Sequence, residues 1–124
     1  MPTIFEIQQE HKRILNQLDN LESISNNEKE VLKETKFQMQ AILNLWNAHE
    51  EKEEELFKSI SPNFPVKTMQ TTHQLLRGHW KVLSLALQSQ DDEIIKIALE
   101  TDGKMFSDRL RNHITEEERF FAKL

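Results

Sequence analysis

The chain has 124 residues and a formal net charge of -5, from 16 lysines and arginines against 21 aspartates and glutamates. This length fits a single domain, residues 1–124, with one core and no room for a second. Basic residues are scattered and form no stripe that could follow phosphates, so nucleic acid is not expected as a partner. Cysteine and tyrosine are absent, which excludes disulfides, thiolate catalysis, iron–sulfur clusters and tyrosinate ligands.

Neither a leader nor a membrane helix is expected from the sequence. No basic-then-apolar segment opens it, and no apolar run approaches the roughly 20 residues that cross a membrane. We therefore expect a soluble cytoplasmic protein with no membrane partner. Only two glycines and three prolines occur, and apolar residues recur at three- and four-residue spacing. The pattern predicts an all-α domain of four helices.

The first predicted helix covers residues 3–23. Thr3 and Glu6 have the spacing of a capping box, which suits a helix N-terminus. Apolar residues and one histidine share a face of this helix: Ile4, Ile7, His11, Ile14, Leu15, Leu18 and Leu21.

The second predicted helix follows a polar break. Asn26 and Asn27 can cap it, and it continues through Val31 to about Ile60. The glutamates on its outer side are expected to form a solvated face. They are Glu50, Glu51, Glu54 and Glu55.

The third and fourth predicted helices follow a segment with two prolines. Proline suits the first position of a helix, so the third is expected from Pro65 to about Gln88. Asp91 and Asp92 can open the fourth, which carries Gly103 in its interior, as a kink or a close helix contact. Short connections make neighbouring helices antiparallel and predict an up-down-up-down bundle.

One motif occurs twice: a histidine, a glutamate four residues later and a phenylalanine eight later. The copies are His49–Glu53–Phe57 in the second predicted helix and His113–Glu117–Phe121 in the fourth. Residues four apart point within about 40° of each other on a helix, so each His/Glu pair can close on one site.

Both pairs interrupt apolar stripes, and the surroundings are expected to be core. The stripes contain Ile42, Leu45, Trp46, Leu56 and Ile60 in the second helix, and Phe106, Leu110, Phe120 and Leu124 in the fourth. Trp46, Trp80, Phe57 and Phe121 are assigned to the core. An unpaired carboxylate in such a stripe is costly, and a metal ion is the commonest partner that would justify it.

Counting along the helices brings histidines from all four to one level. His11 and His73 each lie eight residues after a predicted helix start, about 12 Å from that end of the bundle, and the two motifs fall about 10–16 Å from the same end. The predicted metal ligands are His11, His49, Glu53, His73, His113 and Glu117. Such a set suits iron and could accept zinc or manganese.

The third helix offers an alternative ligand. His79 lies six residues after His73, rotated by about 120°, so the two do not easily serve one site. We assign the ligand to His73. The opposite choice is favoured by the segment His79-Trp-Lys-Val-Leu, whose local pattern is similar to His11-Lys-Arg-Ile-Leu.

Taken together, these motifs resemble the hemerythrin-like HHE cation-binding domains. The resemblance rests on Glu10-His11-Lys-Arg-Ile-Leu, on the motif of His49 and Glu53 followed by Leu56-Phe57, on a histidine after a proline-containing loop, and on the motif of His113 and Glu117. It implies an antiparallel four-helix bundle around two iron ions, a di-iron centre with an oxo or hydroxo bridge when oxidised. Glu53 and Glu117 would bridge, with two histidines on each iron. Ferritin-like di-iron bundles use Glu-x-x-His pairs instead, and no histidine here has a glutamate three residues before it.

The chain departs from the oxygen-carrying hemerythrins in two ways. Their second helix 3 histidine corresponds to Arg77, and their last carboxylate is an aspartate five residues after its histidine, where this chain has Glu118. The resemblance is therefore to the wider family, and it implies a protein that binds or senses a small diatomic, O2 or NO, or handles iron. The alternatives are a di-iron oxidoreductase of the peroxidase, NO reductase or iron oxidase type, and a structural bundle without metal.

Overall fold

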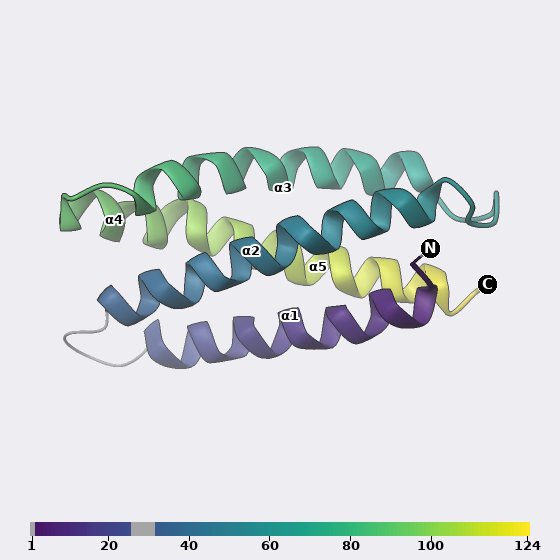
Figure 1. The fold of residues 1–124 in the computed structure, drawn as a ribbon, viewed down its shortest axis with the longest axis horizontal. Helices are drawn as coiled ribbons and strands as arrows, with labels where there is room; N and C mark the ends of the chain where they lie inside the picture. The colour runs from purple at the N-terminus through teal and green to yellow at the C-terminus, as the bar shows by residue number, and fades with distance from the viewer. Residues whose placement is uncertain (1, 26–31) are drawn as a thin grey trace.

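The computed structural model describes residues 2–25 and 32–124 as a bundle of four antiparallel rods (Figure 1). The rods are α1 (Ile4–Ser25), α2 (Leu32–Phe57), α3 (Val66–Leu87), and a fourth made of α4 (Asp92–Ala98), the π-helical segment η1 (Leu99–Gly103) and α5 (Lys104–Phe121). No strand occurs among the described residues. The predicted all-α four-helix bundle is thus confirmed.

The predicted start of α1 is confirmed. The Thr3 hydroxyl oxygen accepts a hydrogen bond from the Glu6 backbone N–H at 3.1 Å, which satisfies one of the free donors at a helix start. The helix runs to Ser25, slightly beyond the predicted end at Ser23. The predicted cap at Asn26 and Asn27, and Val31, lie outside the described residues.

The helix α2 ends at Phe57, not near Ile60 as predicted. After it, the Lys58 N–H bonds to the Glu55 carbonyl at 3.3 Å and the Ser59 N–H to the Leu56 carbonyl at 3.1 Å. These three-residue turns replace the helical pattern because Pro62 follows, and a proline disfavours helix in the residue before it. Beyond the loop, α3 starts directly after Pro65, as predicted within one residue.

The fourth rod begins as predicted and then departs from a regular helix. The Asp91 carboxylate accepts the Glu93 N–H at 2.9 Å and caps α4. The η1 segment ends at Gly103, where an added Cβ would lie 3.3 Å from Met39 Cε. The predicted close helix contact at Gly103 is therefore confirmed. The end of the rod was predicted wrongly, because α5 stops at Phe121 and Leu124 is 49% exposed.

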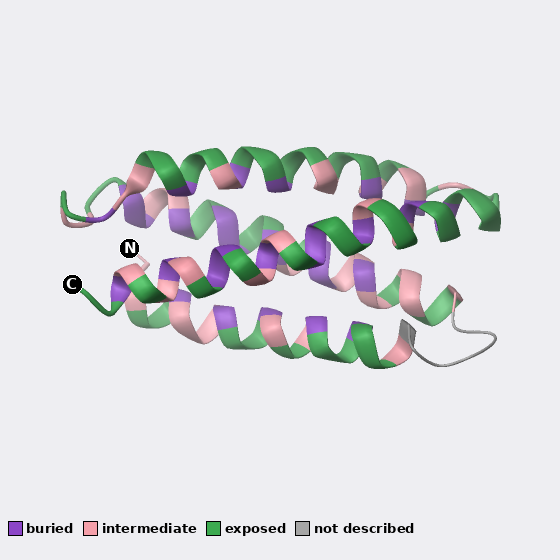
Figure 2. Ribbon diagram, turned by 180° about the vertical axis from the view of Figure 1, so that it is seen from behind, coloured by how far each residue is buried: buried purple, intermediate pink, exposed green. Residues whose placement is uncertain are grey.

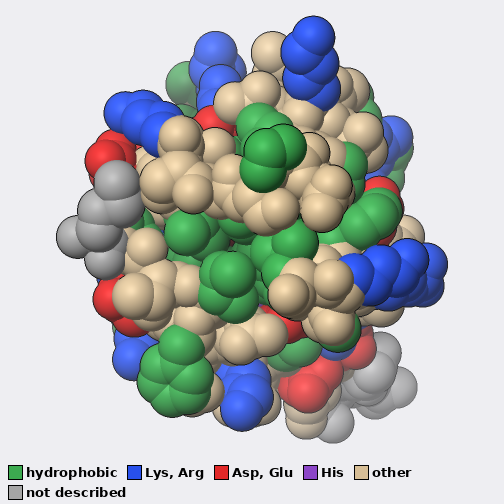
Figure 3. Space-filling model, turned by 90° about the vertical axis from the view of Figure 1, so that its right-hand side faces the viewer, with side chains coloured by type: hydrophobic (Ala, Val, Ile, Leu, Met, Phe, Trp, Pro, Cys, Tyr) green, Lys and Arg blue, Asp and Glu red, His purple; other side chains and the backbone are tan. Residues whose placement is uncertain are grey.

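Two apolar clusters fill the interior, one on either side of a polar layer. Buried positions recur along the inward side of each rod (Figure 2). The smaller cluster lies at the end of the bundle that carries both termini (Figure 1). Hydrophobic side chains also gather on the surface of this end (Figure 3). The smaller cluster contains Ile7, Leu56, Phe57, Phe64, Met69 and Phe121. Of the aromatic residues assigned to the core, Trp46, Phe57 and Phe121 are buried, and Trp80 packs partly buried against the larger cluster.

Candidate metal centre

All six predicted ligands meet in one buried layer between the two clusters. Each is at most 2% exposed. They form two groups, within each of which the donor atoms lie within 4.8 Å of one another. One group contains His11 and His49, the other His73 and His113, and both contain Glu53 and Glu117. The α-helical repeat places them, because each lies on the inward stripe of its helix between residues of the two apolar clusters.

Each carboxylate lies between imidazoles from both halves of the layer. Glu53 Oε1 is 2.6 Å from His49 Nε2 and 3.7 Å from His73 Nε2. Glu117 lies 3.2 Å from the Nε2 atoms of both His11 and His113. This arrangement is what two neighbouring cations bridged by two carboxylates require.

The inward donor atoms are short of hydrogen-bond partners. Within the described residues, the Nε2 atoms of His11 and His49 and all four carboxylate oxygens of Glu53 and Glu117 are buried without one, although they lie close together. The ligand atoms converge on a common space, because those of each group lie within 4.8 Å of one another. Buried carboxylates left in this state are costly, and a cation in that space would compensate all of them. The residues thus fit a metal centre.

The imidazoles and carboxylates of the layer shift one another's pKa values. Burial by itself would lower the pKa of His113, but the Glu117 and Glu53 carboxylates raise it to about 9. Burial would also lower the pKa of His11, but the Glu117 carboxylate raises it.

The two carboxylates differ from each other. Burial and the neighbouring Glu53 both raise the pKa of Glu117. Burial would also raise the pKa of Glu53, but contacts with Glu117 and with the surrounding imidazoles hold it well below its usual range. A proton shared within the layer therefore favours Glu117 and the imidazoles over Glu53.

Three of the four imidazoles are fixed from outside by a second carboxylate. Each donates its Nδ1–H, which directs Nε2 into the layer, where Nε2 of His73 lies 3.1 Å from Nε2 of His113. The pairs are His11 with Glu118 at 2.9 Å, His49 with Glu10 at 2.8 Å, and His73 with Glu54 at 3.2 Å.

Comparison with known families gives a match over nearly the whole chain. The family model of the hemerythrin HHE cation-binding domain matches residues 3–124. The chain belongs to this family. None of the curated proteins or solved structures compared with it matches. Cation binding is the property that names this hemerythrin family, and the buried His/Glu layer of this chain contains groups that could hold a metal ion. No helix in the described part of the chain is long and apolar enough to cross a bilayer.

The alternatives within the hemerythrin-like motif separate clearly in space. His79 stands apart from the layer, with its Nδ1 3.1 Å from Asp102. His73 is in the layer. Likewise Glu117 is in the layer, whereas Glu118 lies outside it as the partner of His11.

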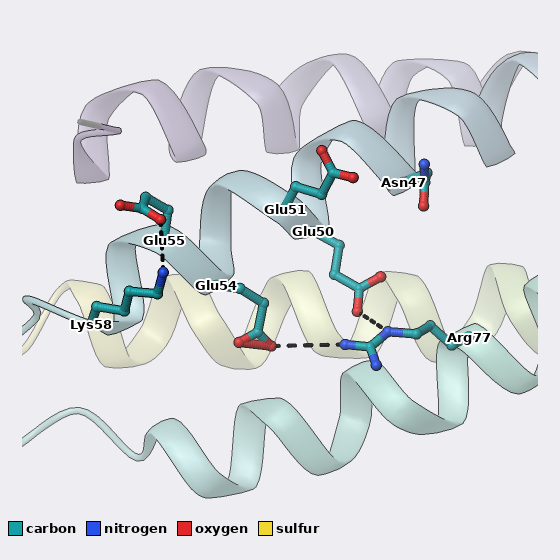
Figure 4. Close-up of a pocket in the computed structure, with 7 residues that line it drawn as sticks. All are labelled: Asn47, Glu50, Glu51, Glu54, Glu55, Lys58 and Arg77. Carbon is teal, nitrogen blue, oxygen red and sulfur yellow. Dashed lines mark hydrogen bonds and ion pairs between the residues drawn. The ribbon is translucent and has the colours of Figure 1, made fainter.

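The expectation of a solvated glutamate face on α2 was wrong for two residues. Glu50 is only 4% exposed and forms an ion pair with Arg77 of α3, and Glu54 is half-buried against His73. Figure 4 shows Arg77 reaching across from α3 toward both carboxylates. Arg77 and the two carboxylates line a surface cavity of about 360 Å³, together with Asn47, Glu51, Glu55 and Lys58. The pattern of α2 alone does not predict the burial of Glu50 and Glu54, because their partner Arg77 lies on α3.

Sequence reasoning missed the outer carboxylates as functional residues, although a signal was present. A second glutamate follows the ligand in both motifs, so that each reads His-x-x-x-Glu-Glu. The third outer carboxylate, Glu10, directly precedes His11. Their roles depend on contacts between helices and were therefore not evident from one helix at a time.

Proposed function

We propose that the chain binds two iron ions in this layer and that the pair reversibly binds a small diatomic molecule, O2 or NO. The observation that carries the proposal is the convergence of four imidazoles and two carboxylates whose inward atoms largely lack hydrogen-bond partners. One ion would be held by His11 and His49, the other by His73 and His113, and both by the bridging carboxylates of Glu53 and Glu117.

The donor set supports iron and an open coordination position. Imidazole and carboxylate together suit iron in proteins. Two imidazoles and two shared carboxylates leave each ion below six ligands, so that iron, when bound, supplies positions at which a diatomic ligand can coordinate. Arg77, at the position of the second helix 3 histidine of oxygen carriers, reaches to Glu50 and adds no ligand.

Aromatic side chains of the chain itself surround the layer and exclude water. The Trp46 ring lies 5.3 Å from the ring of His73 and 5.8 Å from that of His113, centre to centre. Phe57 stacks on His73 at 5.7 Å, and Phe121 stacks on His11 at 6.4 Å. This environment admits a small neutral molecule more readily than an ion or a polar substrate.

Iron handling is a second candidate, favoured by the acidic cavity between α2 and α3 (Figure 4). Glu54 belongs to the lining of this cavity and also bonds to His73. A cation arriving from solvent would therefore meet carboxylates next to a ligand of the layer. Rapid, complete transfer of bound iron to a chelator would favour this function, and slow release would favour the gas binder.

The deciding experiment is reconstitution of metal-free protein with Fe(II) under anaerobic conditions. We expect two irons per chain, with an absorption spectrum that changes on addition of air or NO and returns when the gas is removed. The Glu53→Ala variant should lose the two-metal site, whereas the control Glu34→Ala, which removes an exposed glutamate of the same helix outside the acidic cavity, should retain it. Wild-type protein that retains no iron would refute the proposal.

A further inference from the structure

The layer is built from a helical hairpin that occurs twice. The first hairpin is α1 with α2, and the second is α3 with α5. Each supplies one histidine from its first helix, His11 or His73, and one His-x-x-x-Glu motif from its second helix. The two hairpins thus present equivalent ligands to the two halves of the layer.

The outer support of the ligands repeats as well. In both halves a glutamine side chain donates to a glutamate on the second helix of one hairpin. That glutamate accepts Nδ1–H from the first-helix histidine of the other hairpin. The chains of contacts are Gln8–Glu118–His11, at 2.9 and 2.9 Å, and Gln70–Glu54–His73, at 3.1 and 3.2 Å. The four residues Gln8, Gln70, Glu54 and Glu118 occupy matching positions around their motifs.

The repeat breaks at one position. Glu10, directly before His11, accepts the Nδ1–H of His49 at 2.8 Å and is itself paired with Lys52. The matching residue directly before His73 is Thr72.

This threonine does not replace the missing carboxylate. The Thr72 hydroxyl donates to the backbone carbonyl of Thr68 at 3.3 Å. The Nδ1 atom of His113 is buried and, among the residues that the structure describes, has no hydrogen-bond partner. The second hairpin therefore holds one of its two imidazoles without outer support.

A missing outer partner weakens a metal ligand for two reasons. A carboxylate that accepts Nδ1–H makes the imidazole a stronger donor at Nε2, and it also fixes the ring orientation; loss of such a partner typically costs about 10- to 100-fold in metal affinity. Neighbouring charge does not offset this difference. Each half has one ion pair nearby, Glu10 with Lys52 and Glu50 with Arg77.

We propose that the two metal positions are unequal: the position held by His11 and His49 fills first, and the position held by His73 and His113 fills second and empties first. This inference rests on the two-metal site proposed above. The expected ratio of the two dissociation constants is about 10 to 100, the cost of one absent outer partner.

The test is stepwise addition of Co(II) to the metal-free chain. Calorimetry and visible absorption monitor the binding at each step. Wild-type protein should show two dissociation constants. Glu10→Gln and Glu118→Gln should weaken the tighter one, and Glu54→Gln should weaken the looser one. Glu34→Gln makes the same chemical change at an exposed position of α2, away from the layer and from the acidic cavity, and should alter neither.

A gain-of-function variant complements these losses. Thr72→Glu places a carboxylate at the position that matches Glu10, and it should tighten the looser constant toward the other. Circular dichroism verifies that each variant is folded. If Thr72→Glu does not fold, Glu54→Gln still tests the metal position held by His73 and His113.

The outcomes separate the two proposals. Two equal dissociation constants that Glu10→Gln leaves unchanged would overturn the inequality and leave the two-metal site intact. The reverse order of filling, in which Glu54→Gln weakens the tighter constant, would have the same meaning. Absence of Co(II) binding would refute the proposed function itself.

Discussion

The interior of the bundle contains two unlike regions. Around Gly103 the helices pack through apolar side chains, with Met39 and Leu83 both fully buried and both within van der Waals reach of a Cβ at the glycine. In the layer of Glu53 and Glu117, the buried groups are charged or polar, and the Nε2 atoms of His11 and His49 and all four oxygens of the two carboxylates have no hydrogen-bond partner among the described residues. The packing of the first region needs no ligand, whereas the proposed metal ions would compensate the polar groups of the second. We therefore expect packing to control stability in one region and metal to control it in the other.

The largest effect should come from the apolar region. Leu83→Ala removes a fully buried side chain and should lower the free energy of unfolding by about 2–5 kcal/mol, measured by urea denaturation. Leu85→Ala, on the same helix but 74% exposed, is the matched control and should stay within about 0.5 kcal/mol of wild type. Equal losses for the two variants would mean that α3 does not bury this face.

Metal binding in the polar layer should raise the free energy of unfolding. The size of this increase should not depend on substitutions in the apolar region. At a free metal concentration of about one hundred times the dissociation constant, binding to the native state alone adds about 2.7 kcal/mol. Anaerobic thermal scans with and without Fe(II) should show this increment in wild type and in Leu83→Ala alike. The two sites are independent because Leu83 lies about 15 Å along α3 from the ligand His73. Glu53→Ala should show little or none, and a full increment in that variant would contradict the assignment.

The pH dependence of binding should reveal the protons in the layer. Because its pKa is raised to about 9, His113 is protonated at neutral pH in the metal-free protein, and a ligand imidazole must be neutral. Metal affinity should therefore rise with pH, by up to about tenfold per unit for this one group, and level off above about pH 9. Co(II) calorimetry in buffers of different ionisation enthalpy would count the protons released. Affinity that is constant from neutral pH to pH 9 would exclude a protonated ligand.

The smallest effect should be a gain in stability outside both regions. Gly78 is an exposed interior position of α3, and an added Cβ would meet nothing within 4 Å. Gly78→Ala should stabilise the protein by about 0.5–1 kcal/mol through helix propensity. The same change at Gly103 meets Met39 and should give a smaller gain or a loss, and urea denaturation of both variants measures the difference.

Much of the fold was predictable because its signals are local. Thr3 and Asp91 cap helices in the way their side chains allow, and Pro65 marks the start of α3. The π-helical segment was not predicted. It lengthens the spacing of buried positions to five residues between Ala98 and Gly103, but such small residues do not mark a buried stripe in the sequence. The end of α2 was misplaced because the influence of Pro62 extends back into the turn before it.

The positions of the six predicted ligands followed from counting residues along antiparallel helices, which fixes depth in the bundle. Their role as metal ligands stays a prediction. The surroundings of the ligands were less predictable. Glutamates are usually exposed, and the burial of Glu54 and Glu50 follows from their contacts with His73 and Arg77 on a neighbouring helix. Contacts of this kind depend on how helices rotate about their axes, a quantity that residue counting does not give.

The position of Trp46 gives the protein an optical reporter of its own. The indole lies 5.3–5.8 Å, centre to centre, from the rings of three of the four histidines in the layer. A paramagnetic ion bound there would quench indole fluorescence at so short a distance. The other tryptophan, Trp80, bonds through its indole N–H to the Leu43 carbonyl within the larger apolar cluster. Emission from Trp46 could therefore follow loading and release in real time on unlabelled protein, with a Trp46→Phe variant showing how much signal remains from Trp80.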